Sequence, residues 1–286
     1  MEGAFRSLNR NVYQPLKPIR TSLLYVDNFE AGSKALPNAS IVVPVRNEVE
    51  NITPLLTELR QTLAGLSSFG LFEIIYVDDG SVDATQDVLK SVSENYPELV
   101  ILCHNVAYGQ SAAIRTGVMA ARAPLIITID GDGQNDPADI PKILDAYIKS
   151  QDRENLMVTG HRVQRRDVWV KRISSRIANL IRSILLGDAT PDTGCGLKII
   201  SRKAFLSMPA FNHMHRFLPA LMIGQGGHVV SIKVNHRPRE RGKSNYGVID
   251  RLFVGIIDLL GVLWLKHRAL KINYVSEKEL NKDKIQ

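Results

Sequence analysis

The feature that most constrains the fold is a regular alternation of short apolar runs with longer amphipathic stretches, which begins at Ser40 and continues past Asp136. The apolar runs predict buried strands at 40–45, 73–78, 99–103 and 125–130. Hydrophobic residues at helical spacing predict helices at 48–66, 83–92 and 110–121, and Asp136 followed by Pro137 predicts the start of another. Apolar strands that alternate with helices are typical of a parallel sheet covered on both faces. We therefore predict an α/β fold with a mostly parallel sheet.

Charge is divided unequally along the 286 residues, a length that suits one large domain. Residues 1–159 carry 13 basic and 20 acidic side chains, a net −7, whereas residues 160–286 carry 23 and 9, a net +14. A hydrophobic content of 44% and a charged content of 23% are those of an ordinary globular protein and disfavour a disordered, a collagen-like or a polytopic membrane protein. The asymmetry suggests that the second half meets an anion, which could be nucleic acid, a membrane surface or a phosphorylated substrate.

Three loops at the predicted carboxyl ends of the strands are polar or acidic, and ligands of such sheets bind at this edge. The loops read Pro44-Val-Arg-Asn47-Glu48, Asp78-Asp79-Gly-Ser81 and Asp130-Gly-Asp132-Gly-Gln134. The oxygens of Asp130, Asp132 and Gln134 suit Mg²⁺ or Mn²⁺, although Asp and Gly also form ordinary turns. Of Asp78 and Asp79, one could cap the next helix and the other could accept a hydrogen bond from a nucleobase or a ribose.

The amino-terminal stretch up to Pro18 has no apolar run of the kind found in a signal peptide, so the chain is expected to stay in the cytoplasm. Two cysteines, Cys103 and Cys195, lack the spacing of metal ligands. We expect both to be reduced thiols in that compartment.

Two stretches in the second half, 171–187 and 252–265, are amphipathic or apolar. The first carries arginines around an apolar stripe, which is typical of an interfacial helix but also of a core-packed one. The second is 14 residues long and ends in Trp264, so it is too short to span a bilayer, which takes about 20 residues. We predict an irregular arm at 1–38, one folded domain at 39–250 with halves at 39–159 and 160–250, a membrane-surface helix at 251–270 and a disordered tail at 271–286.

Four motifs in order resemble those of the inverting family 2 glycosyltransferases, and within them the dolichol- and polyprenyl-phosphate sugar synthases. They are Ile41-Val-Val-Pro44-x-x-Asn47-Glu48, Val77-Asp78-Asp79-Gly80-Ser81-x-Asp83-x-Thr85, Asn105-x-x-x-Gly109-x-x-x-Ala113 and Asp130-x-Asp132-x-Gln134-x-x-Pro137. The resemblance covers about residues 38–250. It implies a GT-A (Rossmann-like) fold, here followed by C-terminal amphipathic interfacial helices.

The resemblance also implies a role for individual residues. Nucleotide-sugar binding would fall to Pro44, Asn47, Glu48, Asp78, Asp79 and Asp130. A Mg²⁺ or Mn²⁺ ion would be held by Asp130, Asp132 and Gln134. The acceptor phosphate would be bound by Arg162, Lys171, Arg172, Ser175, Arg176 and Ser244. The catalytic residues would be Asp132, Asp192 and Arg239, although Asp192 could instead cap a turn.

The expected function is metal-dependent, inverting transfer of a sugar from a UDP- or GDP-sugar to a polyprenyl phosphate at the cytoplasmic face of an anionic membrane. A phosphate monoester is already an anion, so it needs no strong general base. One alternative is a relative that uses a soluble or glycan acceptor. A nucleic-acid partner is disfavoured by an aromatic content of 6% and by the acidic loops. A scaffold protein without catalytic activity is disfavoured because Asp130, Asp132 and Gln134 are all present. The donor base and sugar and the oligomeric state, including a homo-oligomer, stay open.

Overall fold

The computed structural model describes residues 36–162, 185–188, 190–239 and 248–268. It contains one seven-stranded sheet in the order β3-β2-β1-β4-β6-β5-β7. The strands are β1 (Ala39–Val45), β2 (Phe72–Asp78), β3 (Leu99–Cys103), β4 (Leu125–Thr128), β5 (Leu156–Arg162), β6 (Lys198–Ser201) and β7 (His228–Val234). Neighbouring strands are parallel except at β6, which runs antiparallel to both β4 and β5. The prediction of a mostly parallel α/β sheet is confirmed.

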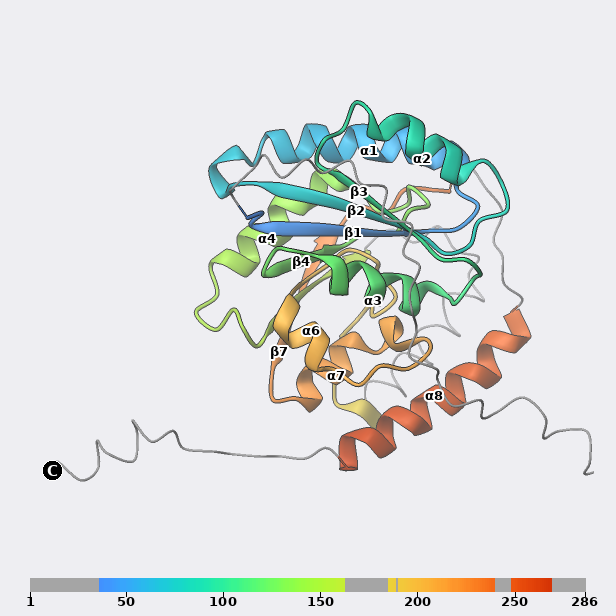
Figure 1. Cartoon of the computed structure of the whole chain (residues 1–286). Helices are drawn as coiled ribbons and strands as arrows, with labels where there is room; N and C mark the ends of the chain where they lie inside the picture. The colour runs from blue at the N-terminus through green and yellow to red at the C-terminus, as the bar shows by residue number, and fades with distance from the viewer. Residues whose placement is uncertain (1–35, 163–184, 189, 240–247, 269–286) are drawn as a thin grey trace, which may run out of the picture.

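Helices cover both faces of the sheet. The α-helices are α1 (Val49–Ala64), α2 (Thr85–Ser93), α3 (Gln110–Ala120), α4 (Ile140–Ile148), α6 (Arg202–Ser207), α7 (Leu218–Gly224) and α8 (Val248–Arg268). Short 3₁₀ helices are η1 (Ser67–Phe69), η2 (Pro137–Asp139) and η3 (Met214–Arg216). Helices α1 and α2 lie over one face, and α3, α6 and α7 over the other (Figure 1). Each face therefore has its own buried apolar layer.

The apolar runs form strands because both of their faces are buried. All seven residues of β1 except Pro44 are buried, as continuous apolar strands of a covered sheet should be. Val45 lies opposite Asp78 in the parallel register of β1 and β2, so these two strands end at the same level. Most predicted boundaries differ from the structure by one or two residues: β4, for example, ends at Thr128 rather than at residue 130, and α1 ends at Ala64 rather than at residue 66. The helix expected after Asp136 begins with the 3₁₀ turn η2.

The apolar stretch near the carboxyl end lies in α8, which begins at Val248, before the predicted residue 251, and runs obliquely along one side of the domain (Figure 1). Val262 is buried against the apolar layer that also includes residues of α7. Within the described ranges, no helix combines the length and hydropathy needed to cross a membrane.

Candidate active site

Asn47 ties the loop after β1 to the loop after β2. Its backbone takes the left-handed conformation, with φ of 55°, which asparagine tolerates better than most residues. Its N–H donates to Ser81 Oγ at 2.8 Å, and its Oδ1 accepts from the N–H of Val82 at 2.9 Å. Pro44 lies within β1 and is half-buried. The loops that follow β1 and β2 are therefore joined by hydrogen bonds at the carboxyl ends of their strands.

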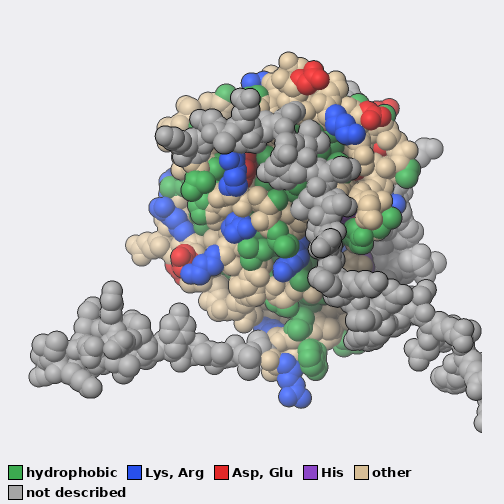
Figure 2. Space-filling model, viewed as in Figure 1, with side chains coloured by type: hydrophobic (Ala, Val, Ile, Leu, Met, Phe, Trp, Pro, Cys, Tyr) green, Lys and Arg blue, Asp and Glu red, His purple; other side chains and the backbone are tan. Residues whose placement is uncertain are grey.

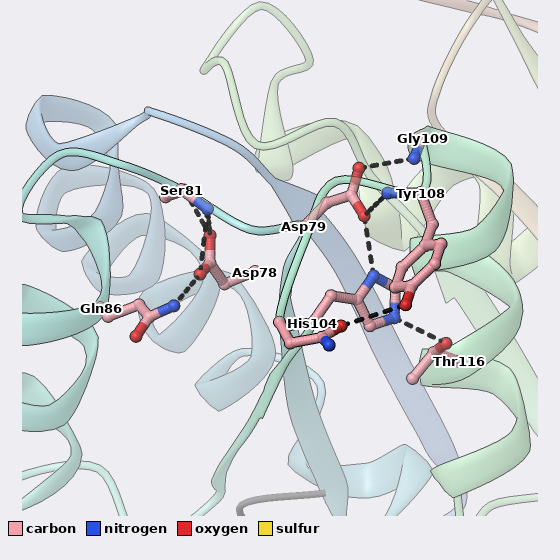
Figure 3. Close-up of polar contacts among 9 residues, drawn as sticks. Asp78, Asp79, Ser81, Gln86, His104, Tyr108, Gly109 and Thr116 are labelled. Carbon is pink, nitrogen blue, oxygen red and sulfur yellow. Dashed lines mark hydrogen bonds and ion pairs between the residues drawn. The ribbon is translucent and has the colours of Figure 1, made fainter. Parts of the chain in front are cut away.

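Asp79 holds the loop that follows β3 (Figure 3). Its Oδ1 accepts from His104 Nδ1 at 2.7 Å and from the N–H of Tyr108 at 2.8 Å, and its Oδ2 accepts from the N–H of Gly109 at 2.7 Å. On the other side of the ring, His104 Nε2 lies 2.9 Å from the Thr116 hydroxyl, so the imidazole is held between Asp79 and Thr116. Burial alone would raise the pKa of Asp79, but these hydrogen bonds outweigh it and hold that pKa below its usual value.

Asp78 is fully buried and has a different set of partners (Figure 3). Its Oδ1 accepts from the hydroxyl and the N–H of Ser81, and its Oδ2 accepts from Gln86 Nε2 at 2.6 Å. Neither Asp78 nor Asp79 caps α2: its N-cap is Ala84, which makes no side-chain capping bond, and just before it Asp83 Oδ1 accepts from the N–H of Thr85 at 3.0 Å. Both Asp78 and Asp79 therefore shape their loops in this structure, and their contact with a nucleotide stays a prediction.

The acidic motif after β4 is crowded with negative charge. Burial, and next the charge of Asp132, raise the pKa of Asp130 to about 6. Asp130 Oδ1 accepts from Gln110 Nε2 at 2.8 Å, and Asp132 Oδ1 accepts from the N–H of Gln134 at 3.1 Å. Burial, and more weakly the charge of Asp132, also raise the pKa of Glu48. Carboxylates held this close are stabilised by a cation between or beside them.

Gly196, just before β6, and Lys198, the first residue of β6, both lie close to Asp130. A Cβ at Gly196 would come within 2.2 Å of the Asp130 carboxylate, so only glycine leaves room for it. Lys198 is 4% exposed, and its Nζ donates to the carbonyl of Cys195. The positive charge of Lys198 partly offsets the raised pKa of Asp130. The sequence motifs gave no role to Gln110 or Lys198; the signal for Lys198 was a lysine at the start of an apolar run.

Arg162 and Asp192 form a buried, bidentate ion pair. Arg162 Nε donates to Asp192 Oδ2 at 2.7 Å and Nη2 donates to Oδ1 at 2.8 Å. Their side chains are only 12% and 6% exposed. One edge of the Arg162 guanidinium, which is predicted to bind the acceptor phosphate, is therefore bonded to Asp192, which is predicted to be catalytic.

Arg239 crosses from the end of β7 to the loop after β1. Its Nη2 donates to Glu48 Oε1, while Glu48 Oε2 accepts from Asn51 Nδ2 at 2.6 Å. Two predicted site residues, Arg239 and Glu48, are therefore brought together from opposite halves of the sequence. The predicted acceptor residues Lys171, Arg172, Ser175, Arg176 and Ser244 lie outside the described residues.

The predicted metal ligands offer a suitable donor set. Asp130, Asp132 and Gln134 present oxygen atoms only, which fits Mg²⁺ or Mn²⁺ rather than a thiophilic metal. In the part of the chain that the structure describes, no three His, Cys, Asp or Glu side chains are placed to hold a metal by themselves. Two carboxylates and an amide leave coordination positions of the kind that water or phosphate oxygens fill. Cys103 and Cys195 are free cysteines in the structure, and their reduced state in the cell stays a prediction.

Two solved structures with a similar fold contain a divalent metal ion and a nucleotide. Glucosyl-3-phosphoglycerate synthase from Mycobacterium tuberculosis, in complex with Mn²⁺, UDP and glucosyl-3-phosphoglycerate, superposes with a TM-score of 0.58 at 15% identity, covering 80% of each chain. A mannosyltransferase from Pyrobaculum calidifontis, in complex with GDP-Man and Mn²⁺, gives 0.55 at 17% identity, covering 82% of this chain and 71% of that one. At these identities the likeness shows the fold, which is of the GT-A type.

Sequence relatives are closer. A dodecaprenyl-phosphate galacturonate synthase from Rhizobium johnstonii is 37% identical over 235 residues, which are 80% of this chain and 68% of the relative. An undecaprenyl-phosphate 4-deoxy-4-formamido-L-arabinose transferase from Edwardsiella ictaluri is 32% identical over 218 residues, or 76% of this chain and 65% of the relative. The chain thus spans about two thirds of the length of these relatives. The family described as Glycosyl transferase family 2 matches residues 40–207. The chain belongs to the family 2 glycosyltransferases.

Proposed function

We propose that this protein transfers a sugar from a UDP- or GDP-sugar to a polyprenyl phosphate, with inversion at the anomeric carbon and with Mg²⁺ or Mn²⁺. The observation that carries the proposal is the crowded acidic motif at the end of β4, supported by Gln110, Gly196 and Lys198. Two relatives whose names state a polyprenyl phosphate and a sugar give the acceptor class.

Each residue of the motif has a proposed task on the donor side. Asp130, Asp132 and Gln134 would hold the cation, which when bound would neutralise charge on the leaving diphosphate. Gln110 keeps the Asp130 carboxylate oriented through its hydrogen bond of 2.8 Å. Pro44, Asn47 and Glu48, with Asp78 and Asp79, form the connected loop edge on which we place the nucleotide.

The acceptor side needs positive charge rather than a base. A phosphate monoester attacks as an anion, so the chain must hold two like-charged phosphates close together and in line. Arginine suits this task because its planar fork matches phosphate oxygens. We assign the positive charge to Arg162, Lys171, Arg172 and Arg176, and hydrogen bonds to the acceptor phosphate to the hydroxyls of Ser175 and Ser244. Asp192 would orient Arg162 through their ion pair, and Arg239 lies at Glu48 beside the donor.

A direct assay tests the proposal. The purified chain, incubated with Mn²⁺ or Mg²⁺, a short-chain polyprenyl phosphate and each of a panel of UDP- and GDP-sugars, is expected to form one lipid-linked sugar of inverted anomeric configuration. Chelation of the metal should stop product formation, and renewed addition should restore it. Absence of product with every donor, from a protein that circular dichroism shows to be folded, would contradict the proposal. Transfer to a soluble glycan but to no polyprenyl phosphate would favour the alternative acceptor class.

We further propose that α8 rests on the cytoplasmic surface of an anionic membrane, the partner expected for a lipid acceptor. Its outer face is apolar and exposed: the exposed fractions are 50% for Ile256, 69% for Ile257, 61% for Leu260 and 62% for Trp264. Figure 2 shows apolar and basic side chains at the lower end of the molecule, where α8 ends in Figure 1. The last turn is basic, with Lys266, His267 and Arg268. Such a helix, apolar outside and basic at one end, matches an anionic lipid interface.

Contacts inside the domain hold α8 in this orientation. Asp258 would be unfavourable at a lipid surface, but it accepts from His213 Nδ1 at 3.0 Å on the inner side. Lys266 Nζ donates to the carbonyl of Leu186 at 2.5 Å, next to Leu185, which is 45% exposed. The end of the stretch predicted to be interfacial at 171–187 therefore meets the end of α8, and Leu185 extends the exposed apolar surface.

Charge placed on the outer face of α8 should weaken membrane binding. For Ile257→Asp combined with Trp264→Asp, we expect partition onto phosphatidylcholine vesicles containing phosphatidylglycerol to fall by about 10-fold or more, because each lost apolar contact is worth roughly 1.5–3 kcal/mol. Vesicle sedimentation measures the effect. The control Leu71→Asp alters a side chain that is also half-exposed but lies at the opposite edge of the sheet. Equal partition of the double variant and this control would contradict the proposal, whereas transfer to a water-soluble short-chain acceptor should be unchanged in both.

A further inference from the structure

The segment that follows β7, Asn235–Arg239, is docked against the loop that carries the acidic motif; we name it the β7 tail. The N–H of Asn235 donates to Asp139 Oδ2 at 2.7 Å, and His236 forms an antiparallel bridge with Asn135. The N–H of Arg237 donates to the carbonyl of Gln134 at 3.0 Å. The β7 tail therefore pairs with the chain directly after Asp132.

Arg237 joins the β7 tail to two other elements at once. Its Nη1 donates to Glu58 Oε2 on α1 at 2.6 Å, and its Nη2 donates to Asp136 Oδ1 at the start of η2 at 2.7 Å. A planar guanidinium can satisfy two carboxylates on different elements with fixed geometry, which the single ammonium of a lysine cannot reproduce. Neither Arg237 nor Glu58 is among the residues to which the sequence motifs give a role.

The direction of the β7 tail links this anchor to the site. Arg237 contacts Glu58, while Arg239, two residues later, contacts Glu48 just before α1 begins. The tail thus runs against the direction of α1 and delivers Arg239 to the nucleotide edge. On the other side, Asn135, which the tail pairs with, accepts from the N–H of Asp130 through its Oδ1 at 3.2 Å. The same docking therefore borders both Arg239 and the acidic motif.

We propose that Arg237 is a positioning residue for sugar transfer: by clamping Glu58 and Asp136, it holds Arg239 and the 134–136 loop in their working arrangement. This inference rests on the proposed function, because it assigns Arg237 to the same reaction. Arg237 acts through other residues and need not touch substrate. A displacement of about 1 Å in a site of this kind can cost up to roughly 100-fold in rate, so a clamp outside the site can control turnover.

Steady-state kinetics on four variants tests the clamp. Arg237→Ala should lower kcat by about 10-fold while the KM for the donor changes by less than about twofold, since the loops at Asn47 and Asp79 are untouched. Arg237→Lys should lie between Arg237→Ala and wild type. Glu58→Gln, on a helix away from the acidic motif, should also lower kcat, and its combination with Arg237→Ala should be no worse than Arg237→Ala alone. Lys203→Ala, which removes an exposed ion pair to Glu154 at 3.2 Å, is the matched control and should behave as wild type.

Hydrogen exchange of the peptide that contains the β7 tail gives a readout independent of turnover. In Arg237→Ala the backbone N–H groups at positions 235 and 237 should exchange faster than in wild type. The exchange is measured at a temperature well below the melting temperatures of both proteins. A kcat of Arg237→Ala equal to that of wild type would overturn the proposal. So would a double variant whose fall in kcat equals the product of the falls in Glu58→Gln and Arg237→Ala. If the wild-type protein forms no product at all, the proposed function fails, and the exchange rates alone decide whether Arg237 holds the tail.

Discussion

Asp132→Ala is expected to abolish sugar transfer, with a fall in kcat of about 10³-fold. The substitution removes one of the two carboxylates proposed to bind the cation, and with it that carboxylate's negative charge. Asp132→Asn should be almost as inactive. Asparagine retains a side-chain oxygen that can accept from the N–H of Gln134, the bond that wild-type Asp132 makes at 3.1 Å. Loss of activity in this variant therefore reports the charge and not the shape of the loop.

The stability of the metal-free Asp132→Asn variant should not fall along with its activity. Asp132 lies near Asp130 and Glu48, and its charge contributes to the raised pKa of both carboxyls. Without metal, removing that charge relieves repulsion, so the melting temperature of Asp132→Asn should equal or exceed that of wild type. The rise in melting temperature that Mn²⁺ with UDP or GDP gives to wild type should disappear. Asp145→Asn, a half-exposed carboxylate on α4, is the control. An Asp132→Asn enzyme that keeps most of its activity would remove the metal role from this motif.

The strands and helices of the first half follow from local pattern. Runs such as Ile41–Val43 are apolar on consecutive positions, and only a strand covered on both faces buries such a run. The direction of β6 does not follow from local pattern, because a four-residue strand carries no signal for its orientation and takes it from the tertiary path of the chain. This is also why the amide and lysine that support Asp130 were missed: Gln110 and Lys198 reach it from 20 and 68 positions away.

Residue roles were harder to predict than residue types. Asp78 and Asp79 were correctly placed at a strand end, but the partners of Asp79 come from His104, Tyr108 and Gly109, which lie 25 to 30 residues away. A sequence motif does not show whether a carboxylate will bind a ligand or its own chain. The charge asymmetry, in contrast, has a direct structural counterpart. Arg239 with Glu48 and Arg237 with Glu58 are ion pairs between the basic and the acidic half, and they meet beside the site.

Asp192→Ala should destabilise the protein by about 3–5 kcal/mol, because it leaves the Arg162 guanidinium, only 12% exposed, without its bidentate partner. The expected size follows from the cost of a buried charge that has lost its counter-ion. Urea unfolding followed by circular dichroism measures it as a lower midpoint. Exposed pairs such as Lys203 with Glu154 contribute at most about 1 kcal/mol, so Glu154→Ala is the matched control.

The double variant Arg162→Met with Asp192→Leu separates the fold from the chemistry of this pair. Replacing both charges by apolar groups of similar size removes the unpaired charge, so stability should return to within about 2 kcal/mol of wild type. Sugar transfer should nevertheless stay at least about 10-fold below wild type, because the cation assigned to the acceptor phosphate is gone. If the double variant transfers sugar normally, the pair serves the fold alone and the acceptor phosphate is held by other residues. If Asp192→Ala unfolds at the wild-type urea concentration, the pair does not carry the buried charge that its geometry indicates.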